Sequence, residues 1–206
     1  MYMELALMNL YTGKRVTTEL FPNMITVLIG RNGYGKTTFL RSVEEYCKEQ
    51  EIPCYFYNDK ENGGAAGMSK LVYAGDMEGL AAMAFHSEGE TMLEAFSQFG
   101  ARRIGRLVHE NIGKANQFFI LIDQLDSGLD CVKLDKIKRL FYEVIIPDIR
   151  RCGMEAYVLL TANSYELIGR EECLDPVTGD HYQFHNMTQF KKYVKSTYSR
   201  RENKES

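Results

Sequence analysis

Short apolar runs separated by polar turns dominate the first quarter of the chain. Residues 3–8 and 15–20 read as two strands, and "YTGKR" between them reads as a turn. "MITVLIG" (24–30) is continuously apolar and rich in β-branched side chains, which predicts a buried strand. "IPCYFY" (52–57) predicts another strand.

Helical periodicity alternates with these runs. Residues 36–49 carry apolar side chains at helical spacing, namely Phe39, Leu40, Val43 and Cys47. Residues 90–108 show a similar pattern, which predicts one long helix or two. Between these two segments lies a polar, glycine-rich loop, "NDKENGGAAGMS".

The second half continues the alternation. "FFILID" (118–123) and "AYVLLTA" (156–162) predict buried strands, and "VKLDKIKRLFYEVI" (132–145) predicts an amphipathic helix between them. "DPVTGDHYQF" (175–184) suggests a hairpin, and the last helix is expected at about 188–199. Strands that alternate with helices indicate an α/β fold with a largely parallel sheet.

Composition narrows the class of protein. The 206 residues suit one domain over 1–206, with a flexible tail at about 200–206. Net charge is −3, which gives no global basic field for nucleic acid, although local basic stretches occur near Arg102 and Lys191. Five cysteines without a CxxC pair favour a reducing compartment. We expect no leader peptide and no membrane insertion, and therefore a cytoplasmic protein.

The strongest motif is "GRNGYGKTT" (30–38), which matches G-x-x-x-x-G-K-[ST] and lies between a predicted strand and a predicted helix. Glycines let such a loop curl so that backbone N–H groups surround phosphates, and the helix that follows adds its positive N-terminus. Lys36 is expected to reach the β- and γ-phosphates, and Thr37 to offer its hydroxyl to Mg²⁺. The predicted phosphate-binding residues are Gly30, Arg31, Asn32, Gly33, Tyr34, Gly35, Lys36, Thr37 and Thr38.

Asp123 is the second predicted metal-side group. It ends an apolar strand, where its carboxylate can hold Mg²⁺ directly or through water. An aspartate that only caps the next helix is the plainer interpretation, and the phosphate-binding loop upstream favours the metal role.

Four stretches together resemble the ABC-type ATPases, particularly the small soluble relatives of the SMC and DNA-repair ATPases. "LIGRNGYGKTT" resembles their P-loop, "HSEGE" (86–90) their signature motif, "ILIDQLDSGLD" their Walker B strand and D-loop, and "LTANSYEL" (160–167) the stretch with their switch histidine. The resemblance covers most of the chain and includes the early hairpin. It implies a P-loop NTPase fold that binds ATP with Mg²⁺.

The resemblance also implies an ATP-dependent homodimer. Ser87, Gly89 and Glu90 would then contact the γ-phosphate bound by the opposite subunit. An ordinary acidic helix cap is the alternative interpretation of "HSEGE". Fewer than sixty residues separate Lys36 from Ser87, so the chain lacks a long coiled-coil arm, and any larger function requires an unidentified partner protein or nucleic acid.

Two departures from the family concern catalysis. The glutamate expected after Asp123 is Gln124, whose carboxamide orients a water but cannot take its proton. The switch histidine aligns with Asn163, which carries no positive charge. Lys36, Gln124 and Asn163 are therefore the predicted catalytic positions of an ATPase with low turnover. The family's loop glutamine has no counterpart, and Asn58 and Asp59 are the nearest polar candidates.

Two other functional classes stay open. A small-molecule kinase, for nucleotides among other acceptors, fits "GKTTFL" and uses "RRIGR" (102–106) as a lid, but leaves "DSGLD" without a role. A nucleotide-independent interaction module with a relic P-loop conflicts with intact Lys36, Thr37 and Asp123. An assay of phosphoryl transfer from labelled ATP to nucleosides distinguishes the kinase from the other two classes. Tyr11 is a candidate for stacking on adenine, with an ordinary hairpin tyrosine as the alternative. The histidines at 181 and 185 are interpreted as surface residues rather than metal ligands.

Overall fold

The computed structural model describes residues 2–9, 13–58, 100–124, 130–161, 163, 165–169 and 171–202, with Asn9 and 199–202 described as backbone only. The chain begins with an antiparallel hairpin of β1 (Met3–Asn9) and β2 (Lys14–Leu20). The main sheet comprises β3 (Met24–Leu28), β4 (Cys54–Asn58), β5 (Gln117–Asp123), β6 (Glu155–Thr161), β7 (Glu172–Leu174) and β8 (His181–Tyr182).

The strands of the main sheet follow the order β4-β5-β6-β3-β7-β8. Every neighbouring pair is parallel except β7 and β8, which form the hairpin predicted near residues 175–184. The structure thus confirms an α/β fold with a mostly parallel sheet and an N-terminal antiparallel hairpin. Strand β6 lies between the strand that leads into the P-loop and the strand that ends at Asp123.

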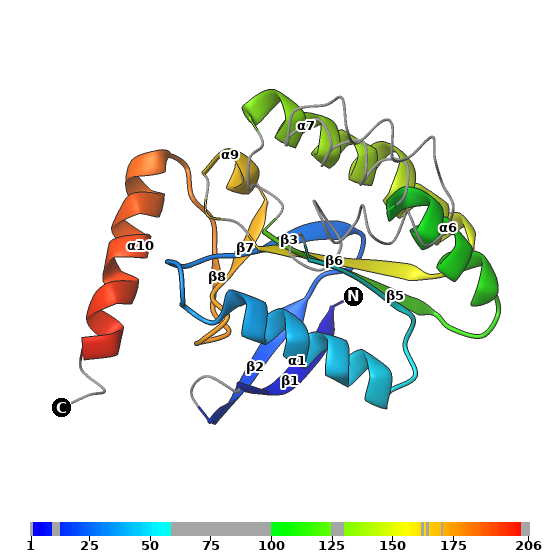
Figure 1. The fold of residues 1–206 in the computed structure, drawn as a ribbon, viewed down its shortest axis with the longest axis horizontal. Coiled ribbons are helices and arrows are strands. Elements are labelled where there is room, and N and C mark those ends of the chain that lie inside the picture. The colour runs from blue at the N-terminus through cyan, green and yellow to red at the C-terminus, as the bar shows by residue number, and fades with distance from the viewer. Residues whose placement is uncertain are drawn as a thin grey trace, which may run out of the picture.

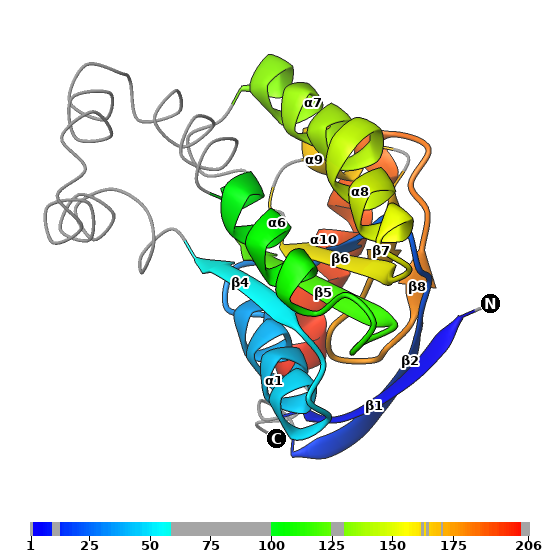
Figure 2. The same cartoon turned by 90° about the vertical axis from the view of Figure 1, so that its right-hand side faces the viewer.

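Helices cover both faces of the sheet (Figure 1). Helix α1 (Lys36–Glu49) and the β1–β2 hairpin lie against one face. The other face carries α6 (Ala101–Glu110), α7 (Cys131–Leu140) and α8 (Ile146–Arg151), and in Figure 2 α8 continues from the end of α7 while α6 lies beside them. The short α9 (Tyr165–Ile168) and the long α10 (Met187–Glu202) lie at the end of the sheet where β3 leads into α1.

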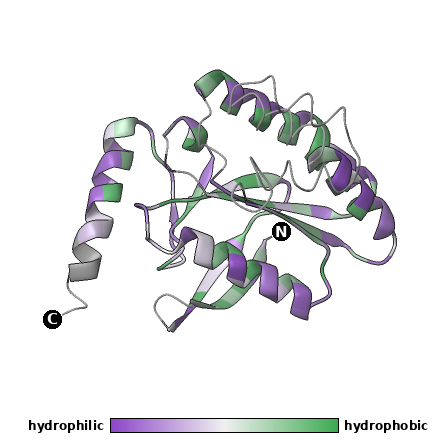
Figure 3. Ribbon diagram, viewed as in Figure 1, coloured by the Kyte–Doolittle hydropathy of each residue, from purple (hydrophilic) through white to green (hydrophobic). Residues whose placement is uncertain are grey.

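Two apolar clusters hold these layers together. In β5, Phe118, Ile120 and Ile122 belong to the cluster under α6–α8, whereas Phe119 and Leu121 belong to the cluster under α1. Side chains of a strand point alternately to opposite faces, so a strand covered on both faces needs an unbroken apolar run. The hydropathy colouring follows this arrangement, with apolar strands inside and polar residues on the outer sides of the helices (Figure 3).

The helix predicted over 132–145 has a different form from the one expected. It starts at Cys131 as α7, widens into a π-helical turn at Phe141–Ile145 and continues as α8. Pro147 offers no backbone N–H and its ring crowds the carbonyl four residues earlier, which lies within the π-helical turn. The wider turn accommodates the proline, so the helix continues instead of ending.

The predicted bounds of two other helices agree closely with those in the structure. Helix α1 spans the predicted residues 36–49, and α10 continues to Glu202, beyond the predicted end at 199. The predicted helical residues 90–99 lie outside the described part of the chain. All five cysteines are free, as expected without a disulfide framework. Among the described residues, no helix combines the length and the apolar character needed to cross a membrane.

Candidate nucleotide-binding site

The P-loop joins the end of β3 to the start of α1 at the carboxyl edge of the parallel strands. Gly30 has φ +133°, and a Cβ added there would lie 2.3 Å from Cδ1 of Tyr34. Gly35 precedes the first helical residue, Lys36, with φ +94°. Both positions therefore need glycine, one for its backbone conformation and the close approach of a ring, the other for its conformation.

Lys36 is a buried cation whose ammonium group curls back over the loop. Its Nζ donates hydrogen bonds to the backbone oxygens of Gly30 at 2.7 Å and Arg31 at 3.1 Å. It also donates to Oδ1 of Asn163 at 2.9 Å, across the sheet edge from the loop after β6. The lysine is thus held at the mouth of the loop, where the motif requires a cation for phosphate.

Asp123, at the end of β5, is almost completely buried and is surrounded by hydrogen-bond donors. Its carboxylate accepts from Oγ1 of Thr37, at 2.9 Å to the nearer oxygen, and from Nδ2 of Asn58 at 2.9 Å. Oγ1 of Thr161 donates to it at 2.8 Å. A buried carboxylate beside a threonine hydroxyl supplies the hard oxygen ligands that Mg²⁺ prefers, so Thr37 and Asp123 fit the predicted metal role.

Strand register explains why these side chains meet. Asn58 is the registered partner of Asp123 across β4 and β5, and Thr161 ends β6 beside Leu28, the last residue of β3. Parallel strands end at one edge of a sheet, and in open α/β folds ligands bind outside these carboxyl ends. Asn58, one of the two candidates for the missing loop glutamine, donates to Asp123, while Asp59 lies outside the described residues.

Thr161 is the site residue that sequence reasoning missed. It is buried, donates to Asp123, and its Oγ1 accepts a hydrogen bond of 2.7 Å from the backbone N–H of Gln124. The signal was present in the sequence: a polar residue ends the apolar run "AYVLLT", as Asp123 ends "FFILID". The sequence pattern alone does not show that Thr161 contacts Asp123. That contact follows from the strand order, because β6 lies beside β5.

Gln124 has φ +59°, a left-handed backbone conformation that costs a residue other than glycine about 1–3 kcal/mol. Its bond to Thr161 fixes the conformation, because it satisfies the Gln124 N–H directly after the strand ends. The half-buried Gln124 therefore follows Asp123 at a defined point of the sheet edge.

Two P-loop residues turn toward other elements instead of the loop interior. The Arg31 guanidinium donates through Nε to the backbone oxygen of Thr197 at 3.4 Å and lies 4.9 Å from the centre of the Tyr198 ring. The hydroxyl of Tyr34 donates to Oδ2 of the buried Asp175 at 3.2 Å. The prediction that all nine loop residues surround phosphate did not anticipate these contacts.

Some of the remaining predicted site residues lie near the start of α1 or α7, and the others lie outside the described residues. Asn32, Gly33 and Thr37 are exposed, and Thr38 is half-buried. Ser87, Gly89, Glu90, Tyr11 and residues 125–129 lie outside the described residues. Asp130, the last residue of the predicted D-loop, caps α7 by accepting from the backbone N–H of Lys133 at 2.9 Å.

The two histidines differ in their surroundings, because His185 is exposed whereas His181 is half-buried. The ring of His181 hydrogen-bonds with Glu172 at 2.9 Å and with Thr18 at 3.0 Å, which ties β8 to β7 and to the N-terminal hairpin. Among the described residues, no group of three or more histidine, cysteine, aspartate or glutamate side chains is arranged to hold a metal ion.

Neither a protein-family model nor a curated protein matches this chain. Solved structures do match. One is the ADP conformation of an ATP-binding cassette of an ABC transporter, at 13% identity and TM-score 0.47, covering 94% of this chain and 95% of that one. Another is a nucleotide-free ATP-binding cassette from an ABC transporter, at 14% identity and TM-score 0.47, covering 94% of this chain and 96% of that one.

Proposed function

We propose that this chain binds ATP with Mg²⁺ at the edge formed by the P-loop, Asp123 and Asn163, and hydrolyses it slowly. One observation carries the proposal. Lys36 and Thr37 are neighbours at the start of α1. Lys36 contacts Asn163, which follows β6, and Thr37 contacts Asp123, which ends β5. A phosphate-binding cation and a pair of metal-type oxygen ligands therefore converge on one place.

Each group has a defined task in this proposal. Backbone N–H groups of the loop and the N-terminus of α1 bind phosphate oxygens, and Lys36 pairs with the β- and γ-phosphates. Thr37 and Asp123 would hold Mg²⁺, which supplies positive charge to the same phosphates. Asn58 and Thr161 orient the Asp123 carboxylate through their hydrogen bonds.

Slow hydrolysis follows from the two neutral side chains. Gln124 orients the attacking water without removing its proton, and Asn163 offers an amide where a histidine could carry charge. General base catalysis and electrostatic stabilisation each typically contribute about 10²- to 10⁴-fold in rate. Because these two positions make neither contribution, the protein keeps its nucleotide long enough for the bound state itself to act as a signal.

The bound state is proposed to drive dimerisation. In this arrangement Ser87 and Gly89 of one subunit contact the γ-phosphate held by Lys36 of the other, so ADP does not support the dimer. The Ser87 segment lies outside the described residues, so this step rests on the sequence motif.

Nucleotide titration of Lys36→Ala tests the binding proposal. The variant loses the cation at the loop mouth, so ATP affinity should fall about tenfold or more, which corresponds to roughly 1.4 kcal/mol. Lys48→Ala is the matched control, because Lys48 lies at the exposed end of the same helix and pairs only weakly with Glu44 and Glu45. Unchanged ATP affinity in a folded Lys36→Ala protein would overturn the assignment.

A further inference from the structure

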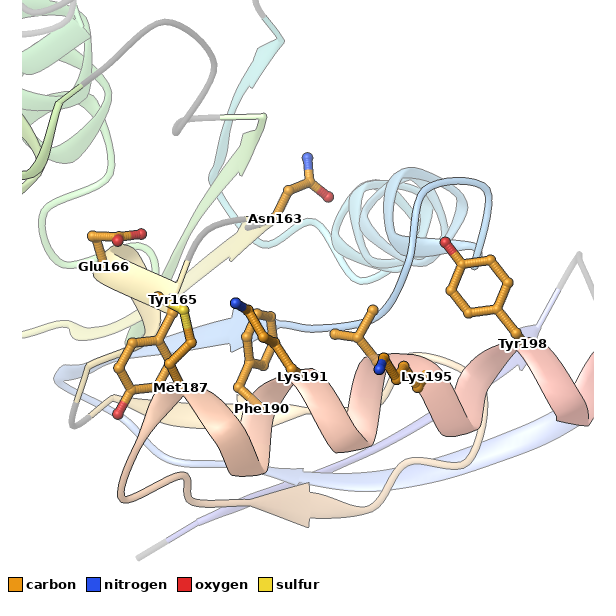
Figure 4. Close-up of a pocket in the computed structure, with 9 residues that line it drawn as sticks. Asn163, Tyr165, Glu166, Met187, Phe190, Lys191, Lys195 and Tyr198 are labelled. Atoms are coloured by element: carbon orange, nitrogen blue, oxygen red, sulfur yellow. The ribbon is translucent and has the colours of Figure 1, made fainter.

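A cavity of about 520 Å³ lies between α10 and the loop that follows β6. Figure 4 shows Asn163 on one side of this cavity and a row of α10 side chains on the other. Its apolar lining includes Phe190, Val194 and Tyr198, and its cationic lining consists of Lys191 and Lys195. Cavities of this size with an apolar lining and a few polar groups are the usual form of small-molecule sites.

Asn163 connects the cavity to the proposed phosphate site. The same amide that lines the cavity accepts the hydrogen bond from Lys36. The cavity therefore opens beside the ammonium group expected to reach the terminal phosphate of a bound nucleotide.

Charge makes this cavity suitable for an anion. Lys191 and Lys195 outnumber the one acidic residue of the lining, Glu166. Within the part of the chain that the structure describes, neither lysine has an ion-pair partner within 4.0 Å. Two exposed ammonium groups one helical turn apart on α10 thus lie along the same side of the cavity.

Contacts between α10 and the P-loop hold this row of lysines in place. Thr197 and Tyr198 of α10 contact Arg31. The hydroxyl of Tyr193 donates to Oδ2 of Asp175 at 2.9 Å, the same oxygen that accepts from Tyr34. The helix is therefore attached to the loop at two points, through Tyr193 and through the Thr197 turn, and its lysines keep a fixed position relative to the phosphate site.

We propose that this cavity receives the terminal phosphate of the bound nucleotide, and that Lys191 and Lys195 bind it. The inference rests on the proposed ATP site and adds a source of positive charge from the same molecule. Lysine is a common point-charge ligand for phosphate. The lysines of α10 thereby add positive charge for binding the γ-phosphate and make the site sensitive to this phosphate without a partner subunit.

Affinities for ATP and ADP, both measured with Mg²⁺, test the proposal. The double variant Lys191→Met/Lys195→Met keeps the aliphatic stems and removes both charges. ATP affinity should fall about tenfold, while ADP affinity should change by less than about twofold, since ADP lacks the phosphate that these lysines contact. Lys191→Arg/Lys195→Arg keeps both charges and should retain most of the ATP affinity.

Lys192→Met is the matched control, because Lys192 is exposed on the same helix but does not line the cavity. It should change neither affinity. All titrations are made at protein concentrations at which a mass measurement finds monomers, so that no partner contributes charge.

The titrations distinguish failure of the lysine proposal from failure of the proposed ATP site. If wild type binds ATP and depends on Lys36 but the double variant keeps its preference for ATP over ADP, the lysine proposal alone is wrong. The lysine proposal is also wrong if the double variant loses ATP and ADP affinity equally. If wild type binds neither nucleotide, or Lys36→Ala binds both normally, the proposed P-loop function fails as well.

Discussion

Oδ1 of Asn163 accepts a hydrogen bond of 2.9 Å from Nζ of Lys36. The two residues are 127 positions apart in the sequence, and the contact joins the loop after β6 to the start of α1. An amide oxygen suits this position because it accepts from an ammonium group without adding a second charge. A protonated histidine at the same place would repel Lys36 until a phosphate lay between them.

Restoring a carboxylate after Asp123 should accelerate hydrolysis. In Gln124→Glu the new carboxylate stands at the position proposed to orient the attacking water, where it can act as a general base, so steady-state phosphate release should rise about tenfold or more. The wild type should turn over well below the typical enzyme range of about 1 to 1,000 per second.

Gln117→Glu provides the control for this change, because Gln117 begins the same strand β5 at the opposite edge of the sheet. It should leave turnover unchanged. Brisk wild-type hydrolysis that does not respond to Gln124→Glu would show that another group, such as Glu90, already acts as the base, and would refute the proposal of slow hydrolysis.

Adding Asn163→His to Gln124→Glu should raise turnover further and make it depend on pH. The imidazole is cationic below its pKa, which is about 6.5 when unperturbed. Turnover of the double variant relative to Gln124→Glu alone should therefore increase as pH falls toward about 6. A ratio that stays constant between about pH 6 and 8 would contradict the placement of Asn163 beside the γ-phosphate.

Thr161 should affect both stability and magnesium binding. Thr161→Val removes one donor to Asp123 and the acceptor for the Gln124 N–H. The unpaired buried groups should lower the free energy of unfolding by about 1–3 kcal/mol, and the magnesium concentration required for ATP binding should rise. Thr26→Val, equally buried but inside β3, should leave the magnesium requirement unchanged.

Mass measurement in solution should show ATP-dependent dimers. Wild type with ATP and Mg²⁺ should double in mass, and ADP should not produce this change. Ser87→Arg places a bulky cation in the signature motif, so it should prevent the dimer and leave monomer binding of ATP nearly intact. A wild type that stays monomeric at saturating ATP, or a variant that dimerises equally well, would exclude the proposed sandwich.

The sequence predicted those parts of the site that depend on local pattern. The run "MITVLIG" followed by "GRNGYGKTT" predicted a buried strand, a loop and a helix, because each element has its own period and its own glycine positions. The position of Asp123 at the end of an apolar strand was predicted in the same way. The parallel sheet followed from the alternation of strands and helices.

Contacts that depend on strand order could not be predicted in this way. Periodicity does not reveal that β6 separates β3 from β5, so Thr161 remained unnoticed although it touches Asp123. Nor does it place α10 against the P-loop. Arg31 bonds to Thr197, 166 residues away, and Tyr34 bonds to Asp175, 141 residues away, which also accepts from Tyr193 of α10. The π-helical turn before Pro147 is a local feature, but tertiary packing decided that the helix continues.

Tyr193 links α10 to the P-loop through Asp175 and should make the fold sensitive to alkaline pH. Burial raises the pKa of the Tyr193 phenol, and the nearby Asp175 carboxylate raises it further. The unfolded chain ionises its tyrosines near about pH 10, whereas the folded chain keeps Tyr193 protonated above that value. Above about pH 10 the unfolded state therefore binds fewer protons, and the free energy of unfolding falls by up to about 1.4 kcal/mol per pH unit for this group.

Tyr193→Phe should remove that contribution. The variant loses the hydrogen bond to Asp175 and should be less stable than wild type at neutral pH by about 1–3 kcal/mol, yet its stability should decline less steeply between about pH 10 and 11. Denaturant unfolding at each pH measures both effects. Tyr198→Phe, an exposed position on the same helix, should leave the alkaline slope as it is. An identical slope in Tyr193→Phe and wild type would mean that the phenol of Tyr193 is not held protonated beside Asp175.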